Sequence, residues 1–164
     1  MTLSDFNLQS VAQACATVSH WCASERWTQQ VVDLRPYDSV ETLARQATEL
    51  WRGVSEADIL QAFAAHPVIG DVELLRQKYA DTARAEQGQV LQADDTVIAE
   101  LAQLNVDYQR KFGFIFIVFA SGKSAAQMRD LLLARIGNNR NQELANGAAE
   151  QEKIMLARLH QYFA

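Results

Sequence analysis

The sequence predicts an all-α protein, a single-domain bundle of about eight or nine helices over residues 1–164. The chain has only two prolines and seven glycines in 164 residues, so few residues interrupt a helix. Apolar residues recur at three- and four-residue spacing along most of its length. Only residues 112–120 have the composition of a strand, and no other segment offers them a partner strand. With 49% hydrophobic residues, the chain is suited to one sizeable core.

Two helices are expected before Pro36. Residues 8–20 are rich in alanine, with an apolar stripe at helical spacing. Trp21 and Trp27 bracket a second, shorter helix, which should end before Arg35, because the residue that precedes a proline disfavours the helical conformation.

Capping boxes predict the starts of three further helices. In this pattern a polar side chain and an acidic or amide side chain three residues later satisfy each other's backbone N–H groups. The helices that they open should end near Arg52, His66 and Gly137. The three pairs are Asp38 with Glu41, Ser55 with Asp58, and Ser124 with Gln127. The remaining helices are expected at residues 72–79, 81–88, 94–112 and 141–162.

His66 is the first candidate for chemistry. It follows Ile59 and Phe63 at helical spacing, and Pro67 should end the helix there. A helix C-terminus favours the imidazolium, whereas burial favours neutral imidazole, so this side chain is suited to proton transfer near neutral pH. The competing interpretation is a core histidine bonded to a carbonyl.

Two polar residues lie on apolar faces. Asn105 falls between Leu101 and Tyr108 on the stripe of a long helix, where an amide is unusual. Arg158 shares a face with Met155 near the end of the chain. The competing interpretation of Asn105 is a buried amide that caps neighbouring backbone. For Arg158 it is a structural ion pair or a side chain that reaches along the surface to solvent.

The strand-like residues 112–120 raise a hydrogen-bonding question. A lone extended segment must satisfy its N–H and C=O groups with loops, side chains, water or a ligand. If it borders a pocket, these backbone groups are natural ligand contacts. The alternative is a buried connector.

Composition and spacing exclude several classes of protein. A net charge of −5 with interspersed acids and bases argues against a nucleic-acid or anionic-membrane partner. Residues 112–120 form the longest apolar run, which is too short to span a bilayer. The chain has no phosphate-binding loop, no Cys-x-x-Cys and no spacing typical of a metal site. Cofactor-free acid–base chemistry around His66 remains.

We expect a cytoplasmic protein. Cys15 and Cys22 are about 10 Å apart if one helix holds both, beyond the reach of a disulfide, so they are predicted to be free thiols. Neither end of the chain carries a recognisable targeting signal.

Four motifs in order resemble a known family. They are His66-Pro67-x-Ile69-Gly70, then Glu86-Gln87-Gly88, then Leu104-Asn105-x-x-Tyr108-x-x-Lys111-Phe112-Gly113-Phe114, and finally Glu152-Lys153-Ile154-x-x-x-Arg158-Leu159. Together they resemble OHCU decarboxylase, where OHCU is 2-oxo-4-hydroxy-4-carboxy-5-ureidoimidazoline. The resemblance covers nearly the whole chain.

The resemblance implies a helical, usually homodimeric, cofactor-independent enzyme that converts OHCU, derived from urate, into (S)-allantoin and CO₂. It implies that His66 is the catalytic histidine and that Glu86 is the acid paired with it. The substrate-binding positions that it implies are Pro67, Ala83, Gln87, Phe116, Ile117, Val118, Phe119, Ala120 and Arg158. Asn105 takes a supporting position. Ala83 replaces a serine found in many relatives, so a hydroxyl contact to the substrate is missing or comes from elsewhere. The alternative from another class is a helical interaction module without activity.

Overall fold

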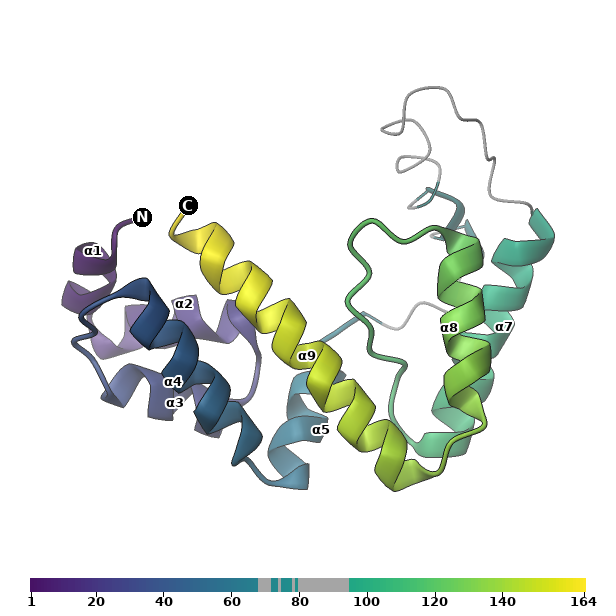
Figure 1. Ribbon diagram of the computed structural model, residues 1–164, viewed down its shortest axis with the longest axis horizontal. Coiled ribbons are helices and arrows are strands. Elements are labelled where there is room, and N and C mark those ends of the chain that lie inside the picture. The colour runs from purple at the N-terminus through teal and green to yellow at the C-terminus, as the bar shows by residue number, and fades with distance from the viewer. Residues whose placement is uncertain (68–71, 74, 78, 80–94) are drawn as a thin grey trace. The chain divides into compact units, whose positions relative to one another are not determined.

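The computed structural model describes residues 1–67, 72–73, 75–77, 79 and 95–164 (Figure 1). Within these ranges the chain forms α helices and no strand, which confirms the all-α prediction. None of the described helices is long and apolar enough to cross a membrane. The helices are α1 (Leu3–Leu8), α2 (Val11–Trp21), α3 (Glu25–Asp33), α4 (Val40–Arg52), α5 (Glu56–Ala64), α7 (Asp95–Phe112), α8 (Ala125–Ile136) and α9 (Arg140–Tyr162).

The chain divides into two compact units. The first comprises residues 1–66 and 148–164, and the second comprises residues 67–147. Helix α9 contributes its first residues to the second unit and the rest to the first. That residues 1–164 make one domain stays a prediction.

Capping by side chains sets where the helices begin. The predicted box of Ser55 and Asp58 opens α5, and that of Ser124 and Gln127 opens α8. The predicted cap at Asp38 is wrong by one residue: Ser39 caps α4, and its hydroxyl accepts the N–H of Thr42 at 3.0 Å. The reason is the register of α4, which begins at Val40 and so places Ser39, rather than Asp38, in the capping position.

The predicted first helix, at residues 8–20, corresponds to α2, and the short helix α1 before it was not predicted. Thr2 with Asp5 opens α1, and Ser10 with Gln13 opens α2, so each start has its own capping box. The break between them falls at Gln9, whose N–H bonds back to the carbonyl of Phe6.

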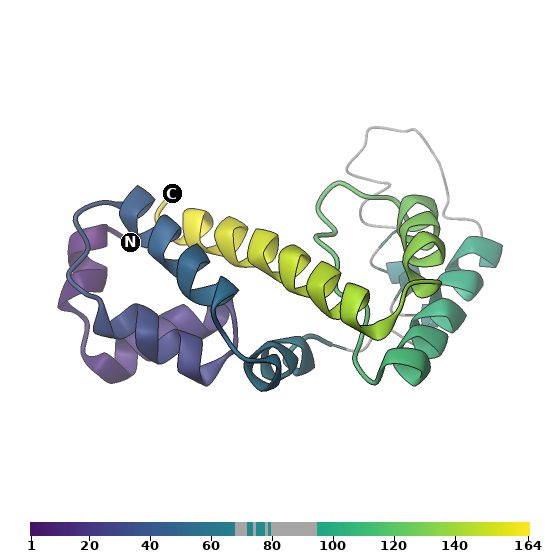
Figure 2. The ribbon, with the colours of Figure 1, turned by 60° about the horizontal axis from the view of Figure 1, so that its bottom comes forward.

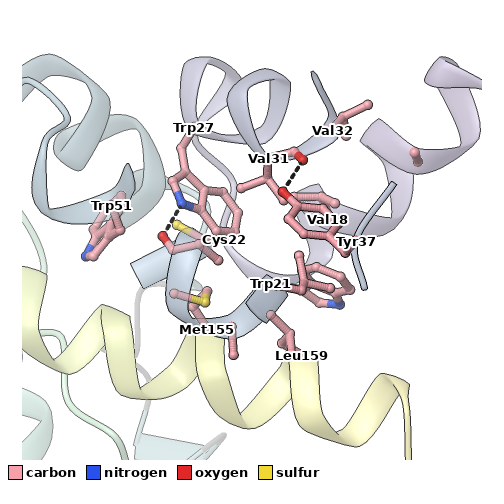
Figure 3. Close-up of a cluster of buried hydrophobic side chains, with 14 of the residues drawn as sticks. Val18, Trp21, Cys22, Trp27, Val31, Val32, Tyr37, Trp51, Met155 and Leu159 are labelled. Carbon is pink, nitrogen blue, oxygen red and sulfur yellow. Dashed lines mark hydrogen bonds between the residues drawn. The ribbon is translucent and has the colours of Figure 1, made fainter. Parts of the chain in front are cut away.

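The core of the first unit is aromatic. Helix α3 packs against both α2 and α4 (Figure 1, Figure 2). Figure 3 shows the indole of Trp27 within this core, with its Nε1 donating to the carbonyl of Ala47 at 2.9 Å. Trp21 and Trp51 are also buried in it, so all three tryptophans of the chain lie in this unit. Met155 and Leu159 of α9 complete the same cluster.

The second unit has its own core, in which α7 packs against α8. Leu101, Tyr108 and Phe112 of α7 are buried, as are Met128 and Leu132 of α8. Aromatic rings contact one another within it, with the Tyr108 and Phe112 centroids 4.5 Å apart and the two planes tilted by 53°. The non-helical residues 113–124 join the two helices.

Candidate active site

His66 lies immediately beyond α5, as the sequence predicts. The helix ends at Ala64, and the N–H of His66 bonds to the carbonyl of Phe63 at 3.1 Å. The imidazole is half-buried, and its Nε2 lies 2.6 Å from Oε1 of Gln151 on α9. An amide oxygen only accepts, so in this contact Nε2 carries a hydrogen and donates it to Oε1 of Gln151. Among the described residues, the imidazole of His66 thus has an amide oxygen as the partner of its Nε2.

Gln151 is a candidate that sequence reasoning missed. It is 1% exposed and belongs, with Met155 and Leu159, to a stripe of residues four apart that are all buried. An amide on a buried stripe needs a partner, and that requirement was the available signal. Gln151, which has a fixed position on α9, orients the imidazole of His66.

Arg158 is exposed, and its Nη1 donates to the carbonyl of His20 at 3.2 Å. It lies seven residues beyond Gln151 on α9, so the two Cα atoms are about 10 Å apart on nearly the same side of the helix. The expectation that Arg158 borders the apolar stripe away from solvent is therefore only partly met. Pro67, next to His66, is exposed as well.

The strand-like segment is neither strand nor helix at residues 115–120. Two cationic side chains bind its carbonyls: Arg135 Nη1 donates to Ile117 at 2.7 Å, and Lys123 Nζ donates to Phe119 at 2.7 Å. Side chains thus satisfy part of the backbone, as the hydrogen-bonding argument required. Ile117 is buried, whereas Phe116, Val118, Phe119 and Ala120 are half-buried.

Two glycines flank this segment. Gly113 has φ +82° and Gly122 has φ +72°, in the left-handed region that other residues avoid. Neither position has an atom within 4 Å of where a Cβ would lie, so the backbone angle rather than space favours glycine.

A buried carboxylate lies close to the segment. Glu143, in the first turn of α9, is 0% exposed and accepts four hydrogen bonds from side chains. The donors are Tyr108 Oη at 2.6 Å, Arg135 Nε at 2.8 Å, Asn138 Nδ2 at 3.0 Å and Asn146 Nδ2 at 2.8 Å. We call these five residues the Glu143 network.

The Glu143 network keeps its carboxylate ionised. Burial alone would raise the pKa of Glu143, but hydrogen bonds from Asn138, Tyr108 and Asn146 and the charge of Arg135 outweigh burial and lower it. Burial and the bond to Glu143 raise the pKa of Tyr108 well above its usual value. The sequence signal for this network was Tyr108, whose hydroxyl needs a partner on a buried face.

The other predicted positions are placed less fully. Asn105 donates from Nδ2 to the carbonyl of Leu101 at 2.9 Å, so its described bond is to its own helix. The predicted acid Glu86 and the predicted pocket residues Ala83 and Gln87 lie outside the described residues. Among the side chains that the structure describes, no group of three or more His, Cys, Asp or Glu is arranged to hold a metal ion.

A surface hollow of about 360 Å³ lies elsewhere in the first unit, between α2 and α3. None of the predicted site residues lines it, and its lining is mostly apolar or uncharged.

A half-buried histidine whose ring is held by a neighbouring side chain is able to take or give a proton. The model of the family described as OHCU decarboxylase matches residues 7–160. The chain belongs to this family.

Known relatives differ in length. The Arabidopsis thaliana uric acid degradation bifunctional protein TTL is 35% identical over 147 residues, which cover 87% of this chain and 45% of that protein. The chain thus spans about half the length of this bifunctional relative. The 2-oxo-4-hydroxy-4-carboxy-5-ureidoimidazoline decarboxylase of Xenopus laevis is 28% identical over 141 residues, which cover 84% of this chain and 77% of the relative.

A solved structure shares both sequence and fold. The crystal structure of OHCU decarboxylase in the presence of (S)-allantoin matches with a TM-score of 0.71 and 33% identity. The match covers 88% of this chain and 95% of that one.

Proposed function

We propose that this chain catalyses the decarboxylation of OHCU to (S)-allantoin and CO₂, a carboxy-lyase step in urate degradation. Membership of the family over residues 7–160 supports the reaction, as does similarity to a decarboxylase that was crystallised in the presence of (S)-allantoin. The observation in the structure that carries the proposal is His66, half-buried beyond the end of α5 with Nε2 held by Gln151.

The chemistry needs stabilisation of negative charge and one proton. Loss of CO₂ breaks the bond between the carboxylate and the ring carbon, and the electron pair stays on that carbon as an enolate-like anion. Donors aimed at this charge lower the barrier. In our proposal, Arg158 and the backbone N–H groups of residues 116–120 supply these donors.

His66 acts as the general acid and base. Glu86 assists it, while Gln151 fixes its ring. His66 helps CO₂ to leave through the substrate hydroxyl and delivers a proton to one face of the anion. Delivery to one face makes the product a single enantiomer. The substrate pocket in this proposal also includes Pro67, Ala83 and Gln87. Asn105 has a supporting role at the pocket.

The protein acts without a cofactor, as a cytoplasmic homodimer. The two cysteines of the chain are free thiols, as predicted, which is consistent with a reducing compartment. The homodimer is tested by the mass of the protein in solution.

The first experiment generates OHCU in solution from urate with the two preceding enzymes and follows allantoin by circular dichroism. We expect an (S)-allantoin signal well above the spontaneous rate. His66→Ala should lower kcat by about 10²–10⁴-fold, the contribution of a positioned general acid or base. His160→Ala is the matched control, because His160 is exposed on α9, and it should keep full activity. Racemic allantoin at the spontaneous rate from folded protein would refute the decarboxylase and favour an interaction module.

A second variant tests the orientation of His66. Gln151→Leu removes the acceptor at 2.6 Å while keeping an apolar side chain in the buried stripe. We expect kcat to fall by about tenfold or more, since misplacement of a catalytic group is costly. Gln151→Glu should shift the pH–rate profile to higher pH, because a carboxylate there favours the protonated imidazole. Normal rates and profiles in both variants would show that this contact has no catalytic role.

A further inference from the structure

Arg135 holds the 115–120 segment by two contacts. Its Nη1 donates to the carbonyl of Ile117 at 2.7 Å, and its guanidinium lies over the ring of Phe116, 4.5 Å from the centroid. The side chain is 12% exposed, so solvent screens these contacts little. One residue of α8 therefore fixes both the backbone and a side chain of the segment.

Glu143 fixes Arg135 in turn. The Nε of Arg135 donates to Glu143 Oε1 at 2.8 Å, and Tyr108, Asn138 and Asn146 hold that carboxylate from other directions. Glu143 also lies in the first turn of α9, where the helix dipole favours an anion. The guanidinium thus has a rigid counter-charge on one side and the segment on the other.

The arrangement is not the most stable one for a buried side chain. Nη2 of Arg135 is buried and has no hydrogen-bond partner among the residues that the structure describes. A buried donor without an acceptor costs free energy, which an apolar side chain at this position would avoid. An arginine at this position is therefore better explained by its hydrogen bonds to Glu143 and to the carbonyl of Ile117 than by a gain in stability.

Peptide geometry passes this hold to the other side of the backbone. The carbonyl of Ile117 and the N–H of Val118 belong to one planar trans peptide and point in opposite directions. A carbonyl bound by Arg135 therefore directs the N–H of Val118 away from Arg135. Lys123 has the same effect on the peptide between Phe119 and Ala120. Its Nζ donates to the carbonyl of Phe119, so the N–H of Ala120 points away from Lys123.

We infer that Arg135 is a positioning residue for the decarboxylation. By holding the carbonyl of Ile117, it aims the N–H of Val118 at the charge that develops on the substrate. The inference rests on the proposed function and narrows it, since it selects one backbone donor from residues 116–120 and names the side chain that orients it. Arg135 touches the segment and not the substrate.

The test compares Arg135→Lys with a change at a fully buried position elsewhere in the same unit. Lysine keeps the charge beside Glu143 but lacks the planar fork that reaches both Glu143 and Ile117. Ile98→Ala is the control, because Ile98 is 0% exposed and lies ten residues before Tyr108 on α7. Both variants are compared with the unmodified chain in the coupled assay and in hydrogen–deuterium exchange of the amides of residues 115–120.

We expect Arg135→Lys to lower kcat at least about tenfold, since small misplacements of a donor are costly. KM should stay within about threefold, because the lost interaction forms in the transition state. Amides in residues 115–120 should exchange faster. Ile98→Ala should lower stability but leave kcat within about twofold of the unmodified chain, because it leaves the segment in place.

The outcomes separate the inference from the function on which it rests. If the unmodified chain makes (S)-allantoin and Arg135→Lys keeps kcat within about twofold, the function stands and the inference is overturned. The same holds if Ile98→Ala lowers kcat as much as Arg135→Lys does. If the unmodified chain makes no (S)-allantoin above the spontaneous rate, the proposed function fails, and the catalytic role of Arg135 fails with it.

Discussion

The two units build their interiors from different materials. In the first, indole and aliphatic side chains of α2, α3, α4 and α9 fill the core, and Trp27 adds one hydrogen bond to a backbone carbonyl. In the second, the aromatic core of α7 and α8 adjoins a carboxylate that is 0% exposed and accepts from four side chains. The interior of the first unit is stabilised mainly by burial of apolar area, whereas that of the second unit also contains the ion pair of Arg135 and Glu143.

This difference between the two interiors bears on the proposed function. Apolar packing is tolerant, because hydrophobic side chains of similar volume replace one another at modest cost. A polar network is demanding, since each unpaired member is penalised, but it fixes geometry more narrowly. The second unit uses such a network beside the 115–120 segment, where the direction of a peptide group matters for the proposed chemistry.

The largest effect is expected from Trp27→Ala. The indole is 0% exposed, and its removal leaves a cavity and takes away a hydrogen bond to the carbonyl of Ala47, so the free energy of unfolding should fall by about 3–5 kcal/mol. Urea denaturation followed by far-UV circular dichroism measures it. Trp27→Phe, which keeps much of the apolar volume, should lose less. Equal losses would mean that the hydrogen bond, and not packing, dominates this core.

Glu143→Gln tests the second interior without changing its size. A carboxamide offers one acceptor oxygen and turns an NH₂ group towards donors, so buried donors of the network lose their acceptor. We expect a loss of about 1–3 kcal/mol in the free energy of unfolding. Glu100→Gln is the control, because Glu100 pairs with Arg129 on the surface and such pairs contribute at most about 1 kcal/mol. Similar losses for the two variants would remove the contrast between the interiors.

Acid should weaken the Glu143 network selectively. The pKa of Glu143 is lowered on folding, so the carboxylate contributes stability above its ordinary value of 4.5. That contribution disappears as the pH falls from this value through the lower pKa of the folded state. The difference in stability between the unmodified chain and Glu143→Gln should therefore shrink from pH 6 to pH 3. A difference that stays constant over this range would show that folding does not lower the pKa of Glu143.

Gly113→Ala should have the smallest effect. At φ +82° an alanine is strained by about 1–2 kcal/mol although nothing lies within 4 Å of its Cβ. Gly137→Ala is the matched control: it is equally open, but with φ −79° it should be neutral or slightly stabilising. Thermal unfolding of both variants measures the contrast, and equal melting temperatures would show that the turn relaxes.

The sequence predicted those features that depend on neighbours along the chain. Helical spacing gave the all-α class, and the boxes at Ser55 and Ser124 gave correct helix starts because a cap is a local contact. Pro67 correctly placed the end of α5 before His66. The sequence also indicated that residues 112–120 have no partner strand, and no strand occurs among the described residues.

Features that depend on distant partners were not predictable in the same way. Glu143 falls among the polar residues 138–143 and looks like a surface acid, and only contacts from α7 and α8 reveal its burial. Gln151 becomes a partner of His66 only through the fold. Nothing in the sequence indicated a role for Arg135, because its hydrogen bond is to the carbonyl of Ile117, 18 residues away along the chain. The predicted pairing of His66 with Glu86 and Arg158 rests on family resemblance.

The placement of the tryptophans gives the protein a built-in optical reporter. Trp21, Trp27 and Trp51 all lie in the first unit, whereas Tyr79 and Tyr108 lie in the second. Indole emission therefore follows one unit alone, while far-UV ellipticity sums the helices of both. Superimposable titration curves from these two signals would mean that residues 1–164 unfold as one cooperative domain, and separated curves would give each unit its own stability.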